Sequence, residues 1–282
     1  LYAMIREETV FGPIFSRRLG SSLGINLLPE RGKICNFDCI YCECGWNRDG
    51  RNDTVLPTAE KVRTDLERKL KECVNALMCE CVSADVSNTN TITQSHNNAI
   101  PIDSITFSGD GEPTINPEFP QIIDDTLRLR DQYYPQAKVS VLSNATRVRI
   151  PEVFNALCKV DNPIMKIDAP TNELVEKINM PAPRYELHRV IEALKQFNGN
   201  FVLQTCMLRG NGFDSSNPEV VGPLMDIVRL LKPREWMVYT INRATPMQGL
   251  QKFSPQEMKT LVQPIIDEGI TKVQIKGAVE DL

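Results

Sequence analysis

Three closely spaced cysteines are the residues best suited to chemistry in this chain of 282 residues. Cys35, Cys39 and Cys42 are separated by three and two residues, and sulfurs so close in one segment can converge on one soft metal centre. A cubane iron–sulfur cluster usually takes four cysteines, so a set of three would leave one iron open to a substrate or cofactor. A structural zinc site also prefers four ligands, and Cys44 would complete that set.

The other cysteines have plainer interpretations. The chain holds nine cysteines, and its first residues, LYAMIREE, lack the basic and apolar stretches of a signal peptide. We therefore expect free thiols in a reducing, cytoplasmic setting, and no disulfide scaffold. Cys73 and Cys158 are expected in the core, with an auxiliary cluster on Cys73, Cys79 and Cys81 as the alternative for the first of them. Cys206 falls on an expected strand whose orientation the pattern leaves undecided.

The elements around these cysteines alternate regularly between short apolar runs and amphipathic stretches. Six strand–helix units predict an α/β protein with a parallel sheet, and six are too few for a full eight-stranded barrel. We expect an open or partial barrel, with the three cysteines after its first strand, at the edge where active sites collect. The expected strands are 23–28, 104–108, 138–142, 164–168, 201–208 and 235–241, with a further one at 272–275, and the expected helices are 58–81, 117–131, 151–159, 185–197, 217–231 and 254–268.

Composition narrows the class of protein further. Apolar residues make up 41% of the chain and charged residues 24%, which predicts a buried core and excludes global disorder. The formal net charge of −4 argues against a general polyanion-binding surface, and no apolar run approaches the length of a membrane span. We expect one domain over 1–282, with a flexible insertion at 83–101, where Ser, Thr and Asn interrupt the periodicity.

The cysteine set resembles the signature of the radical S-adenosylmethionine (SAM) superfamily, in which an aromatic residue, here Tyr41, precedes the last cysteine. The resemblance implies that Cys35, Cys39 and Cys42 hold a [4Fe-4S] cluster whose fourth iron binds the amino and carboxylate groups of SAM. One electron from the cluster would then cleave SAM to methionine and a 5′-deoxyadenosyl radical, which abstracts hydrogen from the substrate. The superfamily fold, a partial (β/α)6 TIM-like barrel, agrees with the units counted above.

Further motifs extend the resemblance along the chain. The segment SGDGEPT at 108–114 resembles the family's Gly-Gly-Glu-Pro motif with one extra residue, and the Ser-Asn pair at 143–144 follows the third strand. At the fourth strand, the segment KIDA at 166–169 resembles the family's Ser-Leu-Asp-Ala pattern, which reaches the ribose and carboxylate region of SAM, with Lys166 in the place of the serine. The resemblance implies that Tyr41 lies near the adenine and that the cofactor cavity is formed with Gly109, Asp110, Gly111, Glu112, Pro113, Ser143, Asn144, Asp168 and Gln204.

A narrower resemblance is to iron–sulfur oxidoreductases related to wyosine-forming tRNA enzymes. It rests on segments such as GINLLP at 24–29, CECG at 42–45, Lys-Ile-Asn at 177–179 and YTINR at 239–243. The wyosine enzymes carry a second cysteine set upstream, whereas residues 1–34 contain no cysteine, so wyosine chemistry is not inferred.

The resemblance leaves the substrate open among a modified tRNA nucleotide, a peptide and a small metabolite. It implies an external one-electron donor such as a flavodoxin or a ferredoxin. The alternative is a non-catalytic zinc or iron–sulfur module that acts in electron transfer. His96 and His188 lack a partner motif for hydrolysis, and the pair Arg17-Arg18 is either solvated or an anchor for an anionic substrate group.

Overall fold

The computed structural model describes residues 8–16, 19–48, 53–75 and 100–277. Most of the expected insertion, 83–99, lies outside these ranges. The following residues singled out above also lie outside them: Arg17, Arg18, Cys79, Cys81 and His96.

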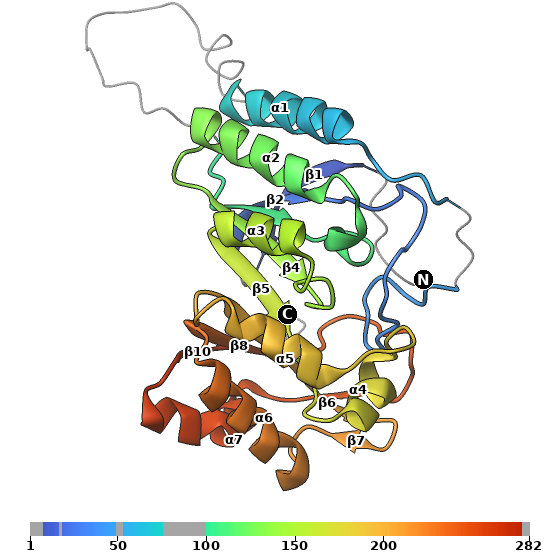
Figure 1. The fold of residues 1–282 in the computed structure, drawn as a ribbon, viewed down its shortest axis with the longest axis vertical. Coiled ribbons are helices and arrows are strands. Elements are labelled where there is room, and N and C mark those ends of the chain that lie inside the picture. Colours follow the sequence, from blue (N-terminus) through green and yellow to red (C-terminus); the bar gives the residue numbers. More distant parts are fainter. Residues whose placement is uncertain (1–7, 17–18, 49–52, 76–99, 278–282) are drawn as a thin grey trace, which may run out of the picture.

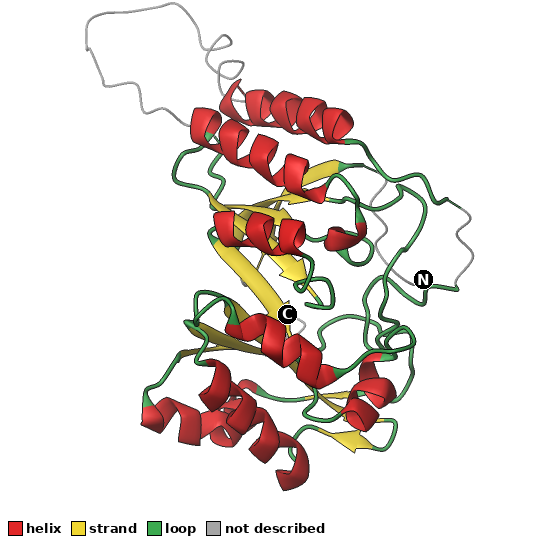
Figure 2. Ribbon diagram, viewed as in Figure 1, coloured by secondary structure: helices red, strands yellow, loops and turns green. Residues whose placement is uncertain are grey.

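One mainly parallel sheet forms the centre of the fold (Figure 2). Neighbouring strands follow the order β1-β2-β3-β4-β5-β6-β8-β10, and every pair from β2 onward is parallel. β1 runs antiparallel to β2, while β7 and β9 pair antiparallel with β6 beyond the barrel wall. The strands are β1 (Val10–Ser16), β2 (Gly20–Ile25), β3 (Ser104–Phe107), β4 (Lys138–Ser143), β5 (Asn162–Lys166), β6 (Val202–Gly210), β7 (Phe213–Asp214), β8 (Glu235–Thr240), β9 (Gln251–Lys252) and β10 (Lys272–Lys276).

Helices cover the outer face of this curved sheet (Figure 1). α1, α2 and α3 pack in sequence over the half that holds β2 to β5, and α5, α6 and α7 over the half that holds β6 to β10. In the described segments no helix has the length and apolarity that a membrane crossing needs. The helices are α1 (Ala59–Asn75), a short 3₁₀ helix η2 (Pro113–Ile115), α2 (Phe119–Tyr133), α3 (Pro151–Lys159), α4 (Asn172–Asn179), α5 (Leu187–Lys195), α6 (Pro218–Leu231) and α7 (Pro255–Glu268).

The open partial barrel expected from the sequence is confirmed. Six strand–helix units are present, and β10 is the extra strand that extends the wall. The sheet remains open because β1 and β10, at its two edges, do not pair with each other in the described residues. All the parallel strands end at one edge, so their connecting loops gather around the barrel mouth.

Local signals explain where the helices begin. Ser254 caps α7 by accepting a hydrogen bond from the backbone of Glu257, whose side chain accepts one from the backbone of Ser254 in return. Asn217 caps α6 in the same position, with Pro218 as the first helical residue. Cys73 is buried on the inner face of α1, as expected.

The prediction that Cys158 lies in the core is wrong, because this residue is exposed. The buried residues of α3 are Val153, Ala156 and Leu157, and the next residue along the helix turns away from that stripe by about 100°. Its thiol therefore faces solvent.

Candidate functional site

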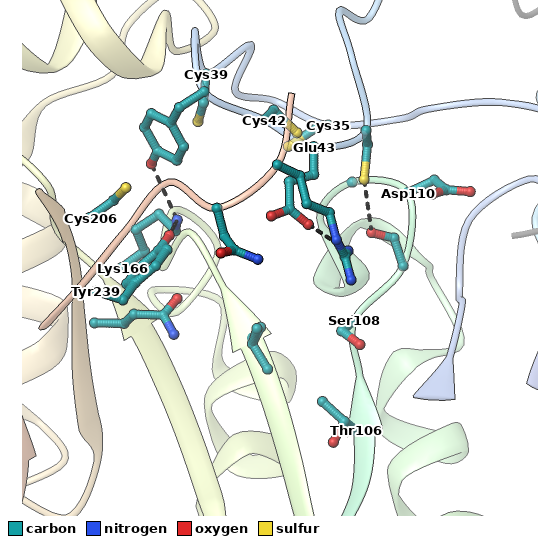
Figure 3. A pocket seen from close by; sticks show the side chains of 18 of the residues that line it. Cys35, Cys39, Cys42, Glu43, Thr106, Ser108, Asp110, Lys166, Cys206 and Tyr239 are labelled. Atoms are coloured by element: carbon teal, nitrogen blue, oxygen red, sulfur yellow. Dashed lines mark hydrogen bonds and ion pairs between the residues drawn. The ribbon is translucent and has the colours of Figure 1, made fainter. Parts of the chain in front are cut away.

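A cavity of about 580 Å³ opens at the mouth of the barrel, a volume typical of small-molecule sites (Figure 3). Its wall is made by the loop after β2, by the ends of β3 and β4, and by β5, β6 and β8 on the other side. Figure 3 separates Ser108 and Asp110 on the first side from Lys166, Cys206 and Tyr239 on the second. The cavity therefore has two chemically different halves.

The cysteine loop forms the roof of this cavity, and Cys35, Cys39 and Cys42 all line it. Asn47 shapes the loop from inside, because its amide donates to the backbone oxygens of Cys35 and Phe37, each at 3.0 Å. The backbone of the loop is also hydrogen-bonded to the end of α4. The backbone N–H groups of Asp38 and Ile40 donate to backbone oxygens of residues 178–180.

Lys33 is buried beneath the same loop. Its ammonium donates to the backbone oxygen of Gly45 at 2.5 Å and forms an ion pair with Asp38 at 3.3 Å. Burial opposes the charge, but the neighbouring sulfurs of Cys42 and Cys35 outweigh it and raise the pKa of Lys33. A fixed positive charge under the thiols favours their ionised, metal-binding form.

The three thiols differ in their acidity. Burial raises the pKa of Cys35 and that of Cys39, the latter to about 11, while a hydrogen bond from Cys44 lowers the pKa of Cys42 to about 6. Cys44 lines the same cavity, and its sulfur lies 3.9 Å from the backbone oxygen of Gly109.

Two kinds of metal centre are candidates for these cysteines, a single zinc ion and a cubane cluster. Among residues of the described ranges, no three His, Cys, Asp or Glu side chains converge as the ligands of a single ion would. One zinc ion needs its sulfurs about 2.3 Å away, and so close to one another. A cubane cluster takes each cysteine on a different iron, and the three thiols that line the cavity would supply three of its four protein positions.

Two glycines of the segment at 108–114 are required by close packing against the neighbouring chain. A Cβ on Gly109 would come within 1.9 Å of the side chain of Asn26, and one on Gly111, at φ +140°, within 1.9 Å of the backbone oxygen of Ile34. Gly111 pairs with Ile34 in a short parallel bridge. The glycines thus let β3's end lie directly beneath the cysteine loop.

Glu112 is buried under the same half of the cavity. Its Oε1 accepts from the backbone N–H and hydroxyl of Thr114 at 3.2 and 2.6 Å, and from the Ser143 hydroxyl at 2.8 Å. Its Oε2 accepts from the backbone N–H of Asn144 at 2.7 Å. Burial raises the pKa of Glu112 although all four hydrogen bonds oppose it. The carboxylate ties the end of β3 to the end of β4.

Asp168 performs the same task on the other half. It accepts hydrogen bonds from the hydroxyl of Tyr41, from the amide of Asn179 at 2.8 Å and from the backbone N–H of Cys206 at 2.8 Å. Asn179 also donates to the sulfur of Cys39 at 3.3 Å. A chain of polar contacts therefore connects the end of β5 and β6 to the sulfur of Cys39.

Lys166 stands on the wall of this second half. Its ammonium donates to the hydroxyl of Tyr239 at 2.7 Å and to that of Tyr41 at 3.2 Å. Burial works against its charge, and Asp168, Tyr239 and Cys39 outweigh it and raise the pKa of Lys166 well above the usual range. Cys206, whose orientation was undecided, points into the cavity together with Gln204.

The structure brings together most of the site residues expected from the sequence. The residues of that set that line the cavity are Cys35, Cys39, Cys42, Tyr41, Gly109, Asp110, Gly111, Glu112, Ser143, Asn144 and Gln204. Pro113 and Asp168 do not line it, because Pro113 begins η2 and Asp168 lies behind Tyr41.

Sequence reasoning missed the roles of Lys33, Asn47, Asn179 and Tyr239. Asn179 and Tyr239 lie in segments that were singled out only because they resemble a known family. The resemblance marked these positions but did not say what the two side chains do. Lys33 and Asn47 act through backbone oxygens of a folded loop, which no spacing rule describes.

Comparisons with known proteins concern the part of the fold that carries this site. The model of the Radical SAM superfamily matches residues 94–215, from before β3 to the end of β7, and the cysteine loop lies outside that match. A UPF0026 protein of Helicobacter pylori is 26% identical over 228 residues, which are 79% of this chain and 64% of that protein. A protein of Brachyspira hyodysenteriae named GTPase Obg is 25% identical over 259 residues, which are 90% of this chain and 33% of that protein. This chain thus spans about one third and about two thirds of the two relatives' lengths.

A solved structure has the same fold. Streptococcus suis SuiB bound to S-adenosylmethionine superposes with a TM-score of 0.57 at 16% identity, over 90% of this chain and 50% of that one. The likeness shows the partial barrel alone, while the family match covers the strands that carry the Gly-Asp-Gly-Glu segment and Asp168. The family match over residues 94–215 and the shared fold both agree with the resemblance of this chain to the radical SAM superfamily.

Proposed function

We propose that the chain is a radical SAM enzyme that holds one [4Fe-4S] cluster on Cys35, Cys39 and Cys42. The observation that carries the proposal is that these thiols and the glycine segment at 109–111 border one cavity, although about seventy residues separate them in sequence. When bound, the cluster and SAM supply an electron and a carbon-centred radical, which is chemistry that no side chain provides.

The chain's own contribution is to hold these groups in place and shield them from water. Lys33 neutralises thiolate charge beneath the loop, and Asn179 donates to the sulfur of Cys39. The backbone from Gly109 to Glu112 presents its polar groups to the methionine end of SAM, with Ser143, Asn144 and Gln204 further along the wall. The electron is supplied by an external one-electron donor of the flavodoxin or ferredoxin class.

The iron and acid-labile sulfide content of anaerobically reconstituted protein tests the cluster. We expect about four of each per chain. Cys39→Ala should lose the brown chromophore and most of the iron. Cys158→Ser is the matched control, because it removes an exposed thiol on α3 and should retain both.

A second measurement tests the reaction. Reduced protein given SAM should form 5′-deoxyadenosine, and Cys39→Ala should form none. A chain that carries one zinc ion without sulfide, or a full cluster with no affinity for SAM, would support the electron-transfer module instead and contradict the proposal.

A further inference from the structure

Four arginines on segments that border the cysteine loop have no acidic partner. Arg48 lies over the ring of Trp46, with its guanidinium carbon 5.6 Å from the ring centroid. Arg147 and Arg149 belong to the turn after β4, and Arg184 to the loop after α4. Within the described ranges none of these four forms an ion pair, whereas the arginines of α2, α5 and α6 all do. The charge of the four arginines is therefore not neutralised by the chain itself.

Hydrogen bonds hold the three segments that carry these arginines against the start of the cysteine loop. The amide of Asn36 donates to the hydroxyl of Thr146 at 2.5 Å, and its backbone oxygen accepts from the N–H of Ala182 at 2.7 Å. In the third segment, the amide of Asn47 donates to the backbone oxygen of Cys35 at 3.0 Å. All three segments therefore meet at Asn36, the residue after the first expected cluster ligand.

The arginine surface, defined by Arg48, Arg147, Arg149 and Arg184, lies outside the cavity. None of the four lines the cavity, whereas Cys35, which they border, does. The sulfur of this cysteine accepts from the backbone N–H of residue 37 at 3.4 Å and lies 3.8 Å from the amide nitrogen of residue 144. A partner on the arginine surface would therefore come close to a cluster ligand without entering the space proposed for SAM.

The composition of the arginine surface suits an acidic protein. The segments 138–151 and 177–185 contain no Asp or Glu. Asp38 and Glu186, which flank the surface, are already in ion pairs with a lysine and an arginine. Met180 is 45% exposed between the segments, and Met, Arg and aromatic residues are enriched where proteins bind proteins. On a chain of formal net charge −4, such a local positive patch steers an acidic partner to one place.

We infer that the arginine surface is the docking site of an acidic one-electron carrier protein that reduces the cluster. The inference rests on the proposed function, which needs one external electron for each SAM molecule cleaved. In this step the carrier is oxidised by one electron, the cluster is reduced by one electron, and no atom is transferred. Electron-transfer encounters use small interfaces, so four arginines suffice, whereas RNA binding needs a longer positive track.

Reduction of the reconstituted cluster by a photoreduced bacterial flavodoxin, and in parallel by a reduced bacterial ferredoxin, tests the arginine surface. Bleaching of the cluster chromophore in a stopped-flow instrument gives the rate. We expect Arg149→Glu with Arg184→Glu to raise the half-saturating concentration of the carrier at least about tenfold. In the wild type this concentration should rise with salt. Dithionite is a small reductant that needs no docking surface, so it should reduce wild type and variant equally.

Two further double variants separate docking from net charge. Arg63→Glu with Lys259→Glu is the matched control, because it reverses two exposed charges on α1 and α7 and leaves the arginine surface intact. It should leave the half-saturating carrier concentration unchanged. Arg149→Lys with Arg184→Lys keeps the positive charge and should retain most of the affinity for the carrier.

Four outcomes would overturn the inference. The first is an unchanged half-saturating concentration in Arg149→Glu with Arg184→Glu, and the second is an equal rise in the matched control. The third is failure of both carriers to reduce a cluster that dithionite reduces. The fourth is loss of tRNA binding in Arg149→Glu with Arg184→Glu while the carrier rates stay unchanged, which would assign the surface to RNA. Absence of 5′-deoxyadenosine in dithionite-reduced wild type would instead count against the proposed function.

Discussion

Replacement of Glu112 by glutamine tests whether this carboxylate clamps the barrel mouth. The side chain is 2% exposed and accepts four hydrogen bonds, three at Oε1 and one at Oε2. Glutamine has the same shape but replaces one acceptor oxygen with an NH₂ donor. The less costly orientation turns that NH₂ toward the backbone N–H of Asn144, so a single donor loses its acceptor.

The expected loss follows from these contacts. A buried N–H left without an acceptor costs about 1–3 kcal/mol, and the three remaining bonds lose the charge that strengthens them. Burial penalises the ionised carboxylate and raises the pKa of Glu112, so removing the charge recovers part of that cost. We therefore expect Glu112→Gln to lower the free energy of unfolding by about 2 kcal/mol.

Urea unfolding of the iron-free chain under reducing conditions measures this loss. Glu192→Gln is the matched control, because Glu192 is an exposed partner of Lys195 on α5, and its unfolding curve should not change. Ser143→Ala combined with Glu112→Gln should be less destabilising than the sum of the two, since Glu112→Gln has already removed the charge that strengthens the bond from Ser143. A loss below about 0.5 kcal/mol for Glu112→Gln, or strict additivity of the pair, would refute the clamp.

Two further predictions concern stability. Gly111→Ala should cost at least about 2 kcal/mol or prevent folding, because the position has φ +140° and its Cβ would strike a backbone oxygen; an unchanged thermal midpoint would contradict this. Asp161→Asn should cost about 1–3 kcal/mol at pH 7. Against burial, the N–H of Val139 and the guanidinium of Arg130 hold the pKa of Asp161 below its usual range. Its contribution is therefore present above the unfolded-state pKa near 4 and lost as the pH falls through the folded-state pKa, so the gap between variant and wild type should narrow in acid in urea titrations at several pH values.

The strong periodicity of the sequence made the barrel predictable. The strands that were missed or misplaced have local causes. β1 was not expected because Gly12-Pro13 interrupts its apolar pattern, and the strand tolerates the proline as an edge strand whose register shifts between Phe11 and Ile14. β2 lies earlier than expected, at Gly20–Ile25, because its pairing with β3 ends at Ile25 and the chain then turns toward the cysteine loop. Leu27 and Leu28 are buried without being in the strand.

Short elements carried too little pattern to be recognised. α4 spans only Asn172–Asn179, and its capping residue Thr171 was overlooked between a strand and the Pro181 that follows. Because α4 was not predicted, the role of Asn179 was not predicted either. Asn179 is the last residue of α4, and its amide donates hydrogen bonds to both Cys39 and Asp168. The motif residues themselves were predictable, because their types and their spacing along the sequence identify them. The contacts that support them depend on tertiary packing and could not be predicted in this way.

The two buried carboxylates explain how the cavity can be both rigid and receptive. Glu112 joins β3 to β4, and Asp168 joins β5 to β6 and Tyr41, so each fixes one half of the mouth. Because the oxygens of both carboxylates accept hydrogen bonds from the protein's own donors, the groups that remain available to a ligand are the backbone of the glycine segment and side chains such as Asn144 and Gln204 that line the cavity.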